Sequence, residues 1–559
     1  MRKRTKLLLA FVVVLIAFFI YLFTVTKMEE PEHIEVYDQD LPVNRVNDSL
    51  LVCGDSWMKL NEYGLWELFV QGDPYTMGFK NGRLSQKLVH YQEEAFVAQI
   101  DELVPSRFYL QFLRVFLGWF NRDLLKYVPK EYQLEVAGVS KSASEEFNFI
   151  APPFQRIMSY HGAHDMGHAL QSMCLVGCTS FGLTNDYSAD SSLLIGRNFD
   201  FYAGDKFSEN KIIAFMKPDD GYPFMSVTWG GMIGVVSGMN LEGLTITLNS
   251  APTGIPSISK TPVSILARKI LQYASTIDEA YAIAQQYETF VSESFLIGSG
   301  KENKFALIEK TPDKIALLYP KENYLAVTNH FLDSSMLLNS EDSLSNFVNA
   351  SHYRLNRVEE LIDSTGKFSV QQVADLLRDR KGTKGANIGL GNEKAINQLI
   401  AHHGIIFKPQ EKKVWISAAP FQLGAFVAYD LDEIFADPQA YRSKNLYLSD
   451  DVIAPDVMLQ NEEYNNFLKY KAGLLKVQKG IDTEMEFSTE ELDAFISLNK
   501  TFYYPYLLVG KYYFEKENYA LAVHSFQAAL KLEIPQQSEY NELLELIKES
   551  EEFIIKAEK

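Results

Sequence analysis

Short β-type segments alternate with helical ones between residues 178 and 440, and this alternation limits the possible folds more than any other feature of the chain. Segments such as CTSFGLTN, SLLIGRNFDF, KIIAFMKP and LTITLNS are rich in β-branched and aromatic residues and are separated by Gly, Asn and Asp turns. Helical stretches such as PVSILARKILQYA and TIDEAYAIAQQY separate one run of strands from the next. Runs of strands with helix pairs between them predict an α+β sandwich, in which helices cover antiparallel sheets.

The N-terminal segment has a different character. MRKRTK is followed by LLLAFVVVLIAFFIYLFTV, an uncharged apolar run of about 19 residues, which is roughly the span of a bilayer core. No small-residue cleavage site follows this run. Residues 1–27 are therefore predicted to form an uncleaved signal-anchor transmembrane helix, which places its basic end in the cytoplasm and the rest of the chain in the periplasm or outside the cell.

Three other regions surround the strand-rich part. Residues 28–59 are polar and lack periodicity, which is typical of a tether. Residues 60–177 have a mostly helical pattern, and their aromatic-rich stretch 107–128 indicates either core or an acyl-chain surface beside the membrane. Residues 456–559 are helical and charged, and 503–536 have the spacing of one tetratricopeptide-type hairpin. A single repeat cannot bury its own apolar face, so this hairpin is expected to pack on neighbouring helices or to offer a groove to a protein partner.

Composition and missing motifs exclude several functions. The chain has 53 Lys and Arg against 72 Asp and Glu, a net charge of −19, whereas a nucleic-acid partner needs a basic face. It contains no G-x-S-x-G, H-E-x-x-H or GxxxxGK[ST] motif, and we expect no cofactor and no nucleic acid. Three cysteines do not make a disulfide framework outside the cytoplasm, so at least one thiol is left over.

Several roles are open for Cys178, which stands between an apolar run and a strand: a small buried hydrophobe, half of a disulfide, a metal ligand or a nucleophile. A regulatory disulfide with Cys174 is one alternative, although the spacing is not C-x-x-C. A zinc site is another, in the cluster of His161, His164, Asp165 and His168, where positions 161, 164 and 168 would share one face of a helix. The same cluster also fits an ordinary polar helix face, and no compelling fourth ligand appears nearby.

Polar residues follow Cys178 at the ends of β segments and favour the nucleophile. They are Arg197 and Asp200 in GRNFDF, Asn249 in LTITLNS, Asn329 in AVTNHF and Arg354 in HYRLNR. Acyl transfer requires these groups: a thiol nucleophile, charged groups that orient it, and amide groups that donate to an oxyanion.

The same motifs, in this order, resemble those of the N-terminal-nucleophile (Ntn) hydrolases. G-C-T-S, GRNFD, N-x-x-G-L…L-N-S, T-N-H and S-x-x-R are most similar to the autoproteolytic family typified by acyl-coenzyme A:6-aminopenicillanic acid acyltransferase, to which choloylglycine hydrolases and penicillin V acylases are related. GDPYTMGFKNGRL, at 72–84, resembles a stretch near the start of that family's precursor. The resemblance runs from about residue 60 to residue 436 and implies the Ntn αββα sandwich over 178–440.

The resemblance also implies roles for individual residues. The chain would cut its own Gly177–Cys178 bond, which frees the α-amine of Cys178 as a base beside the thiol. Arg197 would hold the thiolate, and Asp200 would orient the new amine. Asn249 would donate to the oxyanion, Asn329 would bind the substrate or the tetrahedral oxygen, and Arg354 would brace the site.

Two hypotheses follow for the whole chain. The first is a membrane-anchored, self-processing cysteine amidohydrolase or acyltransferase that acts on the C–N, thioester or ester bond of a small or lipid-like acyl substrate. The alternative is a catalytically silent envelope scaffold with the same fold, which binds a protein partner through its helical tail.

Overall fold

The structure is a computed structural model. It describes residues 3–33, 40–103, 115–169, 177–201, 204–252, 254, 256–336, 348–483 and 485–557. Its strands form two sheets. The larger sheet has the order β1-β2-β3-β4-β7-β8-β9-β10-β11-β12-β13, and the smaller has the order β14-β5-β6-β15-β16-β17. Neighbouring strands are antiparallel except for β4 and β7, which pair in parallel.

The strands are short, as the sequence predicts. Those of the larger sheet are β1 (Val43–Arg45), β2 (Leu50–Cys53), β3 (Ser56–Leu60), β4 (Trp66–Gly72), β7 (Ile212–Pro218), β8 (Phe224–Thr228), β9 (Ser237–Asn240), β10 (Leu244–Ser250), β11 (Glu293–Ser299), β12 (Lys304–Lys310) and β13 (Ile315–Leu318). Those of the smaller sheet are β5 (Thr179–Asn185), β6 (Ser191–Phe199), β14 (Tyr324–Val327), β15 (His403–Lys408), β16 (Lys413–Ser417) and β17 (Phe426–Asp430).

The helices fall into four groups along the chain. The first is α1 (Lys3–Thr26) alone. The second holds α2 (Pro74–Leu103), α4 (Leu124–Tyr127), α5 (Lys130–Ser140) and α6 (Pro153–Ala169). The strand-rich part contributes α7 (Val263–Tyr273), α8 (Ile277–Gln286), α9 (Val348–Thr365), α10 (Val370–Leu377) and α11 (Leu431–Ala436). The tail holds α12 (Glu462–Ile481), α13 (Thr489–Ser497), α14 (Tyr504–Glu515), α15 (Tyr519–Ala529) and α16 (Gln537–Ala557).

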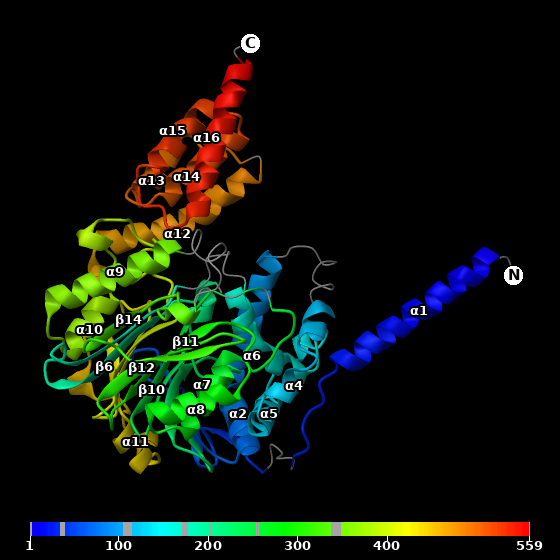
Figure 1. Cartoon of the computed structure of the whole chain (residues 1–559), viewed down its shortest axis with the longest axis vertical. Coiled ribbons are helices and arrows are strands. Elements are labelled where there is room, and N and C mark those ends of the chain that lie inside the picture. Colours follow the sequence, from blue (N-terminus) through cyan, green and yellow to red (C-terminus); the bar gives the residue numbers. More distant parts are fainter. Residues whose placement is uncertain are drawn as a thin grey trace.

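Three apolar clusters show how these layers stack, with the sheets in the body of the molecule in Figure 1. The first lies between the sheets, where Ile195 of β6, Phe215 of β7 and Ile405 of β15 meet. The second joins the outer face of the larger sheet to α2, α7 and α8, and the third joins the outer face of the smaller sheet to α9 and α10. Side chains alternate along the strands, so Leu194 of β6 faces α10 while Ile195 faces the other sheet. This arrangement is the predicted αββα sandwich.

Part of the predicted tether is wrong. Residues 43–60 form β1, β2 and β3, which extend the edge of the larger sheet beyond β4. LLVC and SWMKL pair with each other and with β4, and Cys53 and Trp57 are fully buried. The sequence does not predict β2 and β3 because these strands have only four and five residues and polar neighbours. Such short runs show no detectable hydrophobic periodicity.

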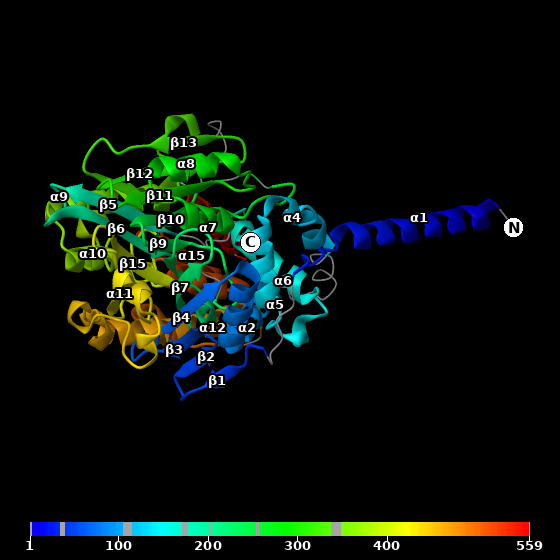
Figure 2. The same cartoon turned by 90° about the horizontal axis from the view of Figure 1, so that it is seen from below.

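The predicted transmembrane segment is not supported by the structure and stays a prediction. Within the described residues, no helix is found that is both long and apolar enough to cross a membrane. α1 projects away from the body in Figures 1 and 2. Its C-terminal end meets the body at α6, where Gln155 Nε2 donates to the carbonyl of Thr26 at 2.8 Å.

The predicted tail hairpin is a pair of packed helices, α14 and α15. Ala522, Phe526 and Ala529 of α15 are fully buried, and a Cβ on Gly510 of α14 would come within 2.4 Å of the Phe526 ring. The tail stacks at one end of the molecule in Figure 1. Its apolar cluster also includes Leu390 and other residues of the strand-rich part, so the hairpin is packed against neighbours as expected.

Candidate active site

Cys178 lies immediately before β5 and is 1% exposed. Its Sγ lies 3.7 Å from Nη2 of Arg197, which donates to the sulfur, and the thiol donates to the carbonyl of Asp200 at 3.8 Å. Arg197 and Asp200 are brought there by β6, which pairs with β5 so that Ser180 lies opposite Arg197. The structure therefore brings together the first three residues that the resemblance implied.

Backbone carbonyls from the larger sheet fix the guanidinium of Arg197. Its Nη1 donates to the carbonyl of Val236 at 2.8 Å and to Oγ of Ser237, and its Nη2 donates to the carbonyl of Leu248. The guanidinium also lies 4.5 Å from the centre of the Phe199 ring. A fully buried cation held in this way is a permanent positive charge beside the sulfur.

Asp200 is a buried carboxyl between two arginines. Burial raises its pKa to about 7, and the charges of Arg354 and Arg197 and the side chain of Gln422 only partly offset this effect. Neither carboxyl oxygen has a hydrogen bond within 3.5 Å to any described residue. This carboxyl has open acceptor positions and lies close enough to Cys178 for its charge to raise the pKa of the thiol, so it is suited to receive an amine formed there.

Asn329 and Arg354 form a second connected pair. Nη2 of Arg354 donates to Oδ1 of Asn329 at 2.6 Å, and its Nη1 donates to the carbonyl of Glu393 at 2.7 Å. Nδ2 of Asn329 donates to both the carbonyl and the hydroxyl oxygen of Ser250. Arg354 lies close enough to Asp200 and Cys178 for their charges to influence its pKa, so this pair belongs to the same site.

Asn249 stands at the end of β10, beside the strand that follows Cys178. Its Oδ1 accepts from Oγ of Ser180 at 2.5 Å. Its Nδ2 makes a long hydrogen bond of 3.3 Å to the carbonyl of Val327. This amide donor is therefore engaged, but by a weak partner that it can leave.

The thiol of Cys178 is protonated at neutral pH in the unprocessed chain. Burial raises its pKa to about 11, and the carboxylates of Asp200 and Glu293 add to the rise, whereas Arg197 lowers it. A thiol of this kind needs a base before it can act as a nucleophile. The α-amine of Cys178 becomes available as that base only when the Gly177–Cys178 bond is cut.

Sequence reasoning missed three groups of this site. Glu293 opens β11 opposite Ser250 and acts on the thiol from the larger sheet. His403 lies beside Arg197, and its Nε2 is 2.9 Å from Oγ of Ser237. Gln398 donates from Nε2 to the carbonyl of Gly177 at 2.8 Å. The adjacent histidines at the start of β15 were the one visible signal, because a glutamate or glutamine in a β-rich chain is unremarkable by itself.

The described residues do not support the zinc alternative. Nδ1 of His161 is bound to the carbonyl of Ile157 at 2.9 Å, and its Nε2 accepts from the amide of Ile233 at 3.0 Å. Asp165 accepts from the amide of Val263 at 2.8 Å, at the start of α7. Among the described residues no group of three His, Cys, Asp or Glu could hold a metal. Cys174 and the side chains of His164 and His168 lie outside the described part.

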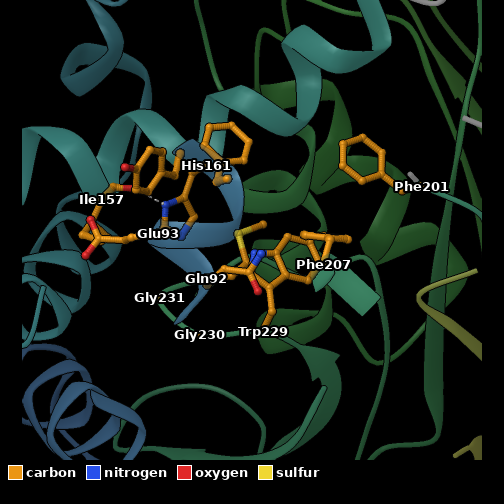
Figure 3. Close-up of a pocket in the computed structure, with 12 residues that line it drawn as sticks. Gln92, Glu93, Ile157, His161, Phe201, Phe207, Trp229, Gly230 and Gly231 are labelled. Carbon is orange, nitrogen blue, oxygen red and sulfur yellow. Dashed lines mark hydrogen bonds between the residues drawn. The ribbon is translucent and has the colours of Figure 1, made fainter. Parts of the chain in front are cut away.

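A mostly apolar cavity of about 40 Å³ lies between α2, α6 and the loop after β8 (Figure 3). Phe201, Phe207 and Trp229 line it, and Glu93 and His161 stand on the opposite side in Figure 3. The three aromatic residues pack in one apolar cluster with Cys178. Three aromatic side chains that line the cavity therefore belong to the apolar cluster around the sulfur.

Comparison with known proteins bears on these residues. The model of the acyl-coenzyme A:6-aminopenicillanic acid acyl-transferase family matches residues 187–421. The chain is related to this family over that segment. The matched acyl-transferase segment contains five of the predicted site residues, namely Arg197, Asp200, Asn249, Asn329 and Arg354. It begins after Cys178, so the match does not include the proposed nucleophile.

Individual relatives are distant. An uncharacterized protein of Archaeoglobus fulgidus is 26% identical over 356 residues, which are 56% of this chain and 58% of that protein. Protein dcd1A of Dictyostelium discoideum is 23% identical over 266 residues, which are 43% of this chain and 56% of that protein. The chain thus spans less than three fifths of the length of these curated relatives.

Solved structures show a weaker likeness. An N-acylethanolamine-hydrolyzing acid amidase ortholog of Caenorhabditis elegans is 14% identical, with a TM-score of 0.32, and the match covers 45% of this chain and 99% of that one. A variant of the conjugated bile acid hydrolase of Clostridium perfringens is 13% identical, with a TM-score of 0.33 and coverage of 45% and 93%. At these scores the likeness carries no argument about the site.

Proposed function

We propose that the chain is a self-processing cysteine amidohydrolase or acyltransferase whose nucleophile is Cys178. One observation carries the proposal: the buried sulfur of Cys178 is in contact with the fixed guanidinium of Arg197 and with the backbone of Asp200. A buried cysteine with a purely structural role does not need a buried cation beside it, because the desolvation of that cation is costly. The relation to the acyl-transferase family supports acyl transfer or amide hydrolysis as the class of reaction.

The proposed cycle assigns one task to each group. The α-amine of Cys178 takes the proton of the thiol, and the charge of Arg197 stabilises the thiolate. The carboxyl of Asp200 accepts a hydrogen bond from that amine. The thiolate then attacks the acyl carbonyl, and Nδ2 of Asn249 exchanges its 3.3 Å bond with Val327 for the developing oxyanion. When the oxyanion collapses, the bond from the acyl carbon to the leaving amine, alcohol or thiol breaks, and the leaving group takes the proton from the α-ammonium of Cys178. Water or an acceptor amine finally releases the acyl group from the sulfur.

An apolar acyl group is the proposed substrate part. The cluster of Phe201, Phe207 and Trp229 packs with Cys178, and together with the cavity that these three residues line it offers mainly apolar surface. Burying each methylene of an acyl chain contributes about 0.8 kcal/mol, so longer chains gain affinity as far as the space allows.

Turnover of acyl amides tests this proposal. The purified full chain is incubated with amides of acetate, hexanoate and dodecanoate that share one amine, and the free acid and the mass of the Cys178-bearing fragment are measured. We expect a higher kcat/KM for the apolar acyl groups than for acetyl, and a mass increase of one acyl group on that fragment. A processed chain that hydrolyses no amide, ester or thioester of these acids would contradict the proposal.

Membrane anchoring through residues 1–27 forms part of the proposal and has support from the sequence and from the exposed apolar side chains of α1, such as Leu9, Phe11 and Val14. We expect the full chain to stay with membranes during alkaline carbonate extraction and a chain that lacks residues 1–27 to be released. Release of both chains would contradict anchoring and would leave the proposed chemistry intact. Binding of a protein partner to the tail stays a prediction.

A further inference from the structure

We propose that Gln398 is a catalytic residue of self-processing, as the hydrogen-bond donor to the carbonyl oxygen of Gly177 when the Gly177–Cys178 bond is cut. The inference rests on the proposed function, because it concerns the step that creates the N-terminal nucleophile. It assigns a role to a residue outside the set that the sequence motifs implied.

The contact is short, buried and specific to the bond that is cut. Nε2 of Gln398 donates to the Gly177 carbonyl at 2.8 Å, and Gln398 is 2% exposed. On the other side of the residue, the amide of Gly177 donates to the carbonyl of Asp200 at 2.9 Å. The same Asp200 carbonyl accepts from the thiol of Cys178. Gly177 is therefore held at both its N–H and its C=O, next to the sulfur that attacks it.

Glycine at position 177 is what permits this contact. A Cβ at that position would lie 2.3 Å from Nε2 and 2.6 Å from Oε1 of Gln398, closer than any carbon can approach. The side-chain amide thus occupies the space that a larger residue at position 177 would fill. Glycine at position 177 therefore leaves the space in which the side-chain amide of Gln398 reaches the carbonyl.

The chemistry of the cut explains why a donor is needed there. The carboxylate of Asp200, whose charge acts on the thiol, takes the proton of Cys178, Sγ forms a bond to the carbonyl carbon of Gly177, and the C=O electron pair moves to the oxygen. The Nε2–H of Gln398 points at that oxygen and stabilises its negative charge. When the oxyanion collapses, the C–N bond breaks, and the nitrogen of Cys178 takes the proton that the thiol gave up. Water then hydrolyses the thioester, which leaves a carboxylate on Gly177 and the thiol and amine on Cys178.

Hydrogen bonds and an unusual backbone conformation hold the loop that carries Gln398. The next residue, Leu399, has a φ of +57°, a left-handed conformation that is unfavourable for leucine and persists only where other contacts enforce it. Its amide donates to Oδ1 of Asn397 at 3.0 Å. Further back, the loop is joined to the tail, where Asn499 exchanges hydrogen bonds with both the amide and the carbonyl of Leu390. The tail thus braces the segment that presents the donor.

The test is the rate at which the full chain cuts itself. Gln398→Ala is expected to slow the appearance of the two fragments about 10²–10³-fold, the usual effect of removing one oxyanion donor. Gln272→Ala is the matched control, since Gln272 is also a buried glutamine whose amide binds a carbonyl, that of Asp220 at 2.8 Å. We expect the control to cut itself at the wild-type rate. If a folded Gln398→Ala chain cuts itself at the wild-type rate, this inference is overturned but the proposed function is not. A wild-type chain that stays uncut would overturn the proposed function.

A second variant separates the chemical role from a structural one. Gln398→Glu keeps the shape but loses the donor when its carboxyl is ionised and regains it when protonated. We expect its cutting rate, divided by the wild-type rate at each pH, to rise as the pH falls. A ratio that stays constant with pH would contradict the donor role, and so would a variant that cuts as fast as the wild type at every pH. The melting temperature of each variant shows that it is folded.

Discussion

Replacing Cys178 by alanine is expected to leave the chain in one piece and without activity. The variant has no sulfur to attack Gly177, so the α-amine that should serve as base is never formed. Because nucleophile and base come from the same residue, its loss removes both tasks, and we expect no residual acyl transfer above background. A denaturing gel of the purified chain shows the processing, and release of the free acid shows the turnover.

Cys53→Ala is the control for this experiment. Cys53 is also a buried cysteine, and its thiol donates to the carbonyl of Leu41 at 3.4 Å, far from the site in the edge strands of the larger sheet. Loss of one buried sulfur there costs about 1 kcal/mol or more of stability and should not affect cutting. Equal processing by wild type and Cys178→Ala would remove Cys178 from the mechanism.

Stability that falls with rising pH is the second large effect we expect, and it traces to Asp200. The chain used is Cys178→Ala, which stays uncut. In the folded chain burial raises the pKa of Asp200 to about 7, whereas its ordinary value is 3.8. Between these values the folded carboxyl keeps a proton that the unfolded one releases, so raising the pH favours unfolding. The stabilisation is fully present below the ordinary value, is lost as the pH rises through about 7, and is on the order of 4 kcal/mol.

Urea unfolding of Cys178→Ala and of Cys178→Ala with Asp200→Asn, from about pH 4.5 to about pH 8, isolates this contribution. Other buried carboxyls, such as Glu309, titrate in both chains and cancel in the comparison. We expect the free energy of unfolding to fall more steeply with pH when Asp200 is present. If the free energies of unfolding of the two chains run parallel against pH, Asp200 is ionised in the folded chain throughout this range, and the prediction is contradicted.

The sandwich could be predicted because the sequence of each strand carries its own signal. In β6 and β10, β-branched and aromatic residues stand between Gly, Asn and Asp, and both strands fold as the pattern predicts. Arg197, Asp200 and Asn249 were found because each stands at or near the end of such a strand, where the resemblance supplied its role. The convergence of β5 and β6 on one sulfur follows from their pairing.

The roles of the other site residues cannot be predicted from the residues next to them in the sequence. Gln398 lies in a loop more than two hundred residues after Gly177, and only the folded chain brings the two together. Glu293 acts on the thiol from the other sheet, across the interior of the sandwich. The role of the tail was hidden for the same reason. Its spacing predicts a helix pair, but Asn499 and Leu390 meet only in three dimensions.

The N-terminal residue of the downstream fragment tests the central claim most directly. Full-length protein is purified, its polypeptides are separated under denaturing conditions, and each is measured by intact mass and N-terminal sequencing. We predict two polypeptides, one that ends at Gly177 and one that begins at Cys178. A preparation that turns over acyl substrates while its only polypeptide runs unbroken through Gly177 and Cys178 would contradict the account.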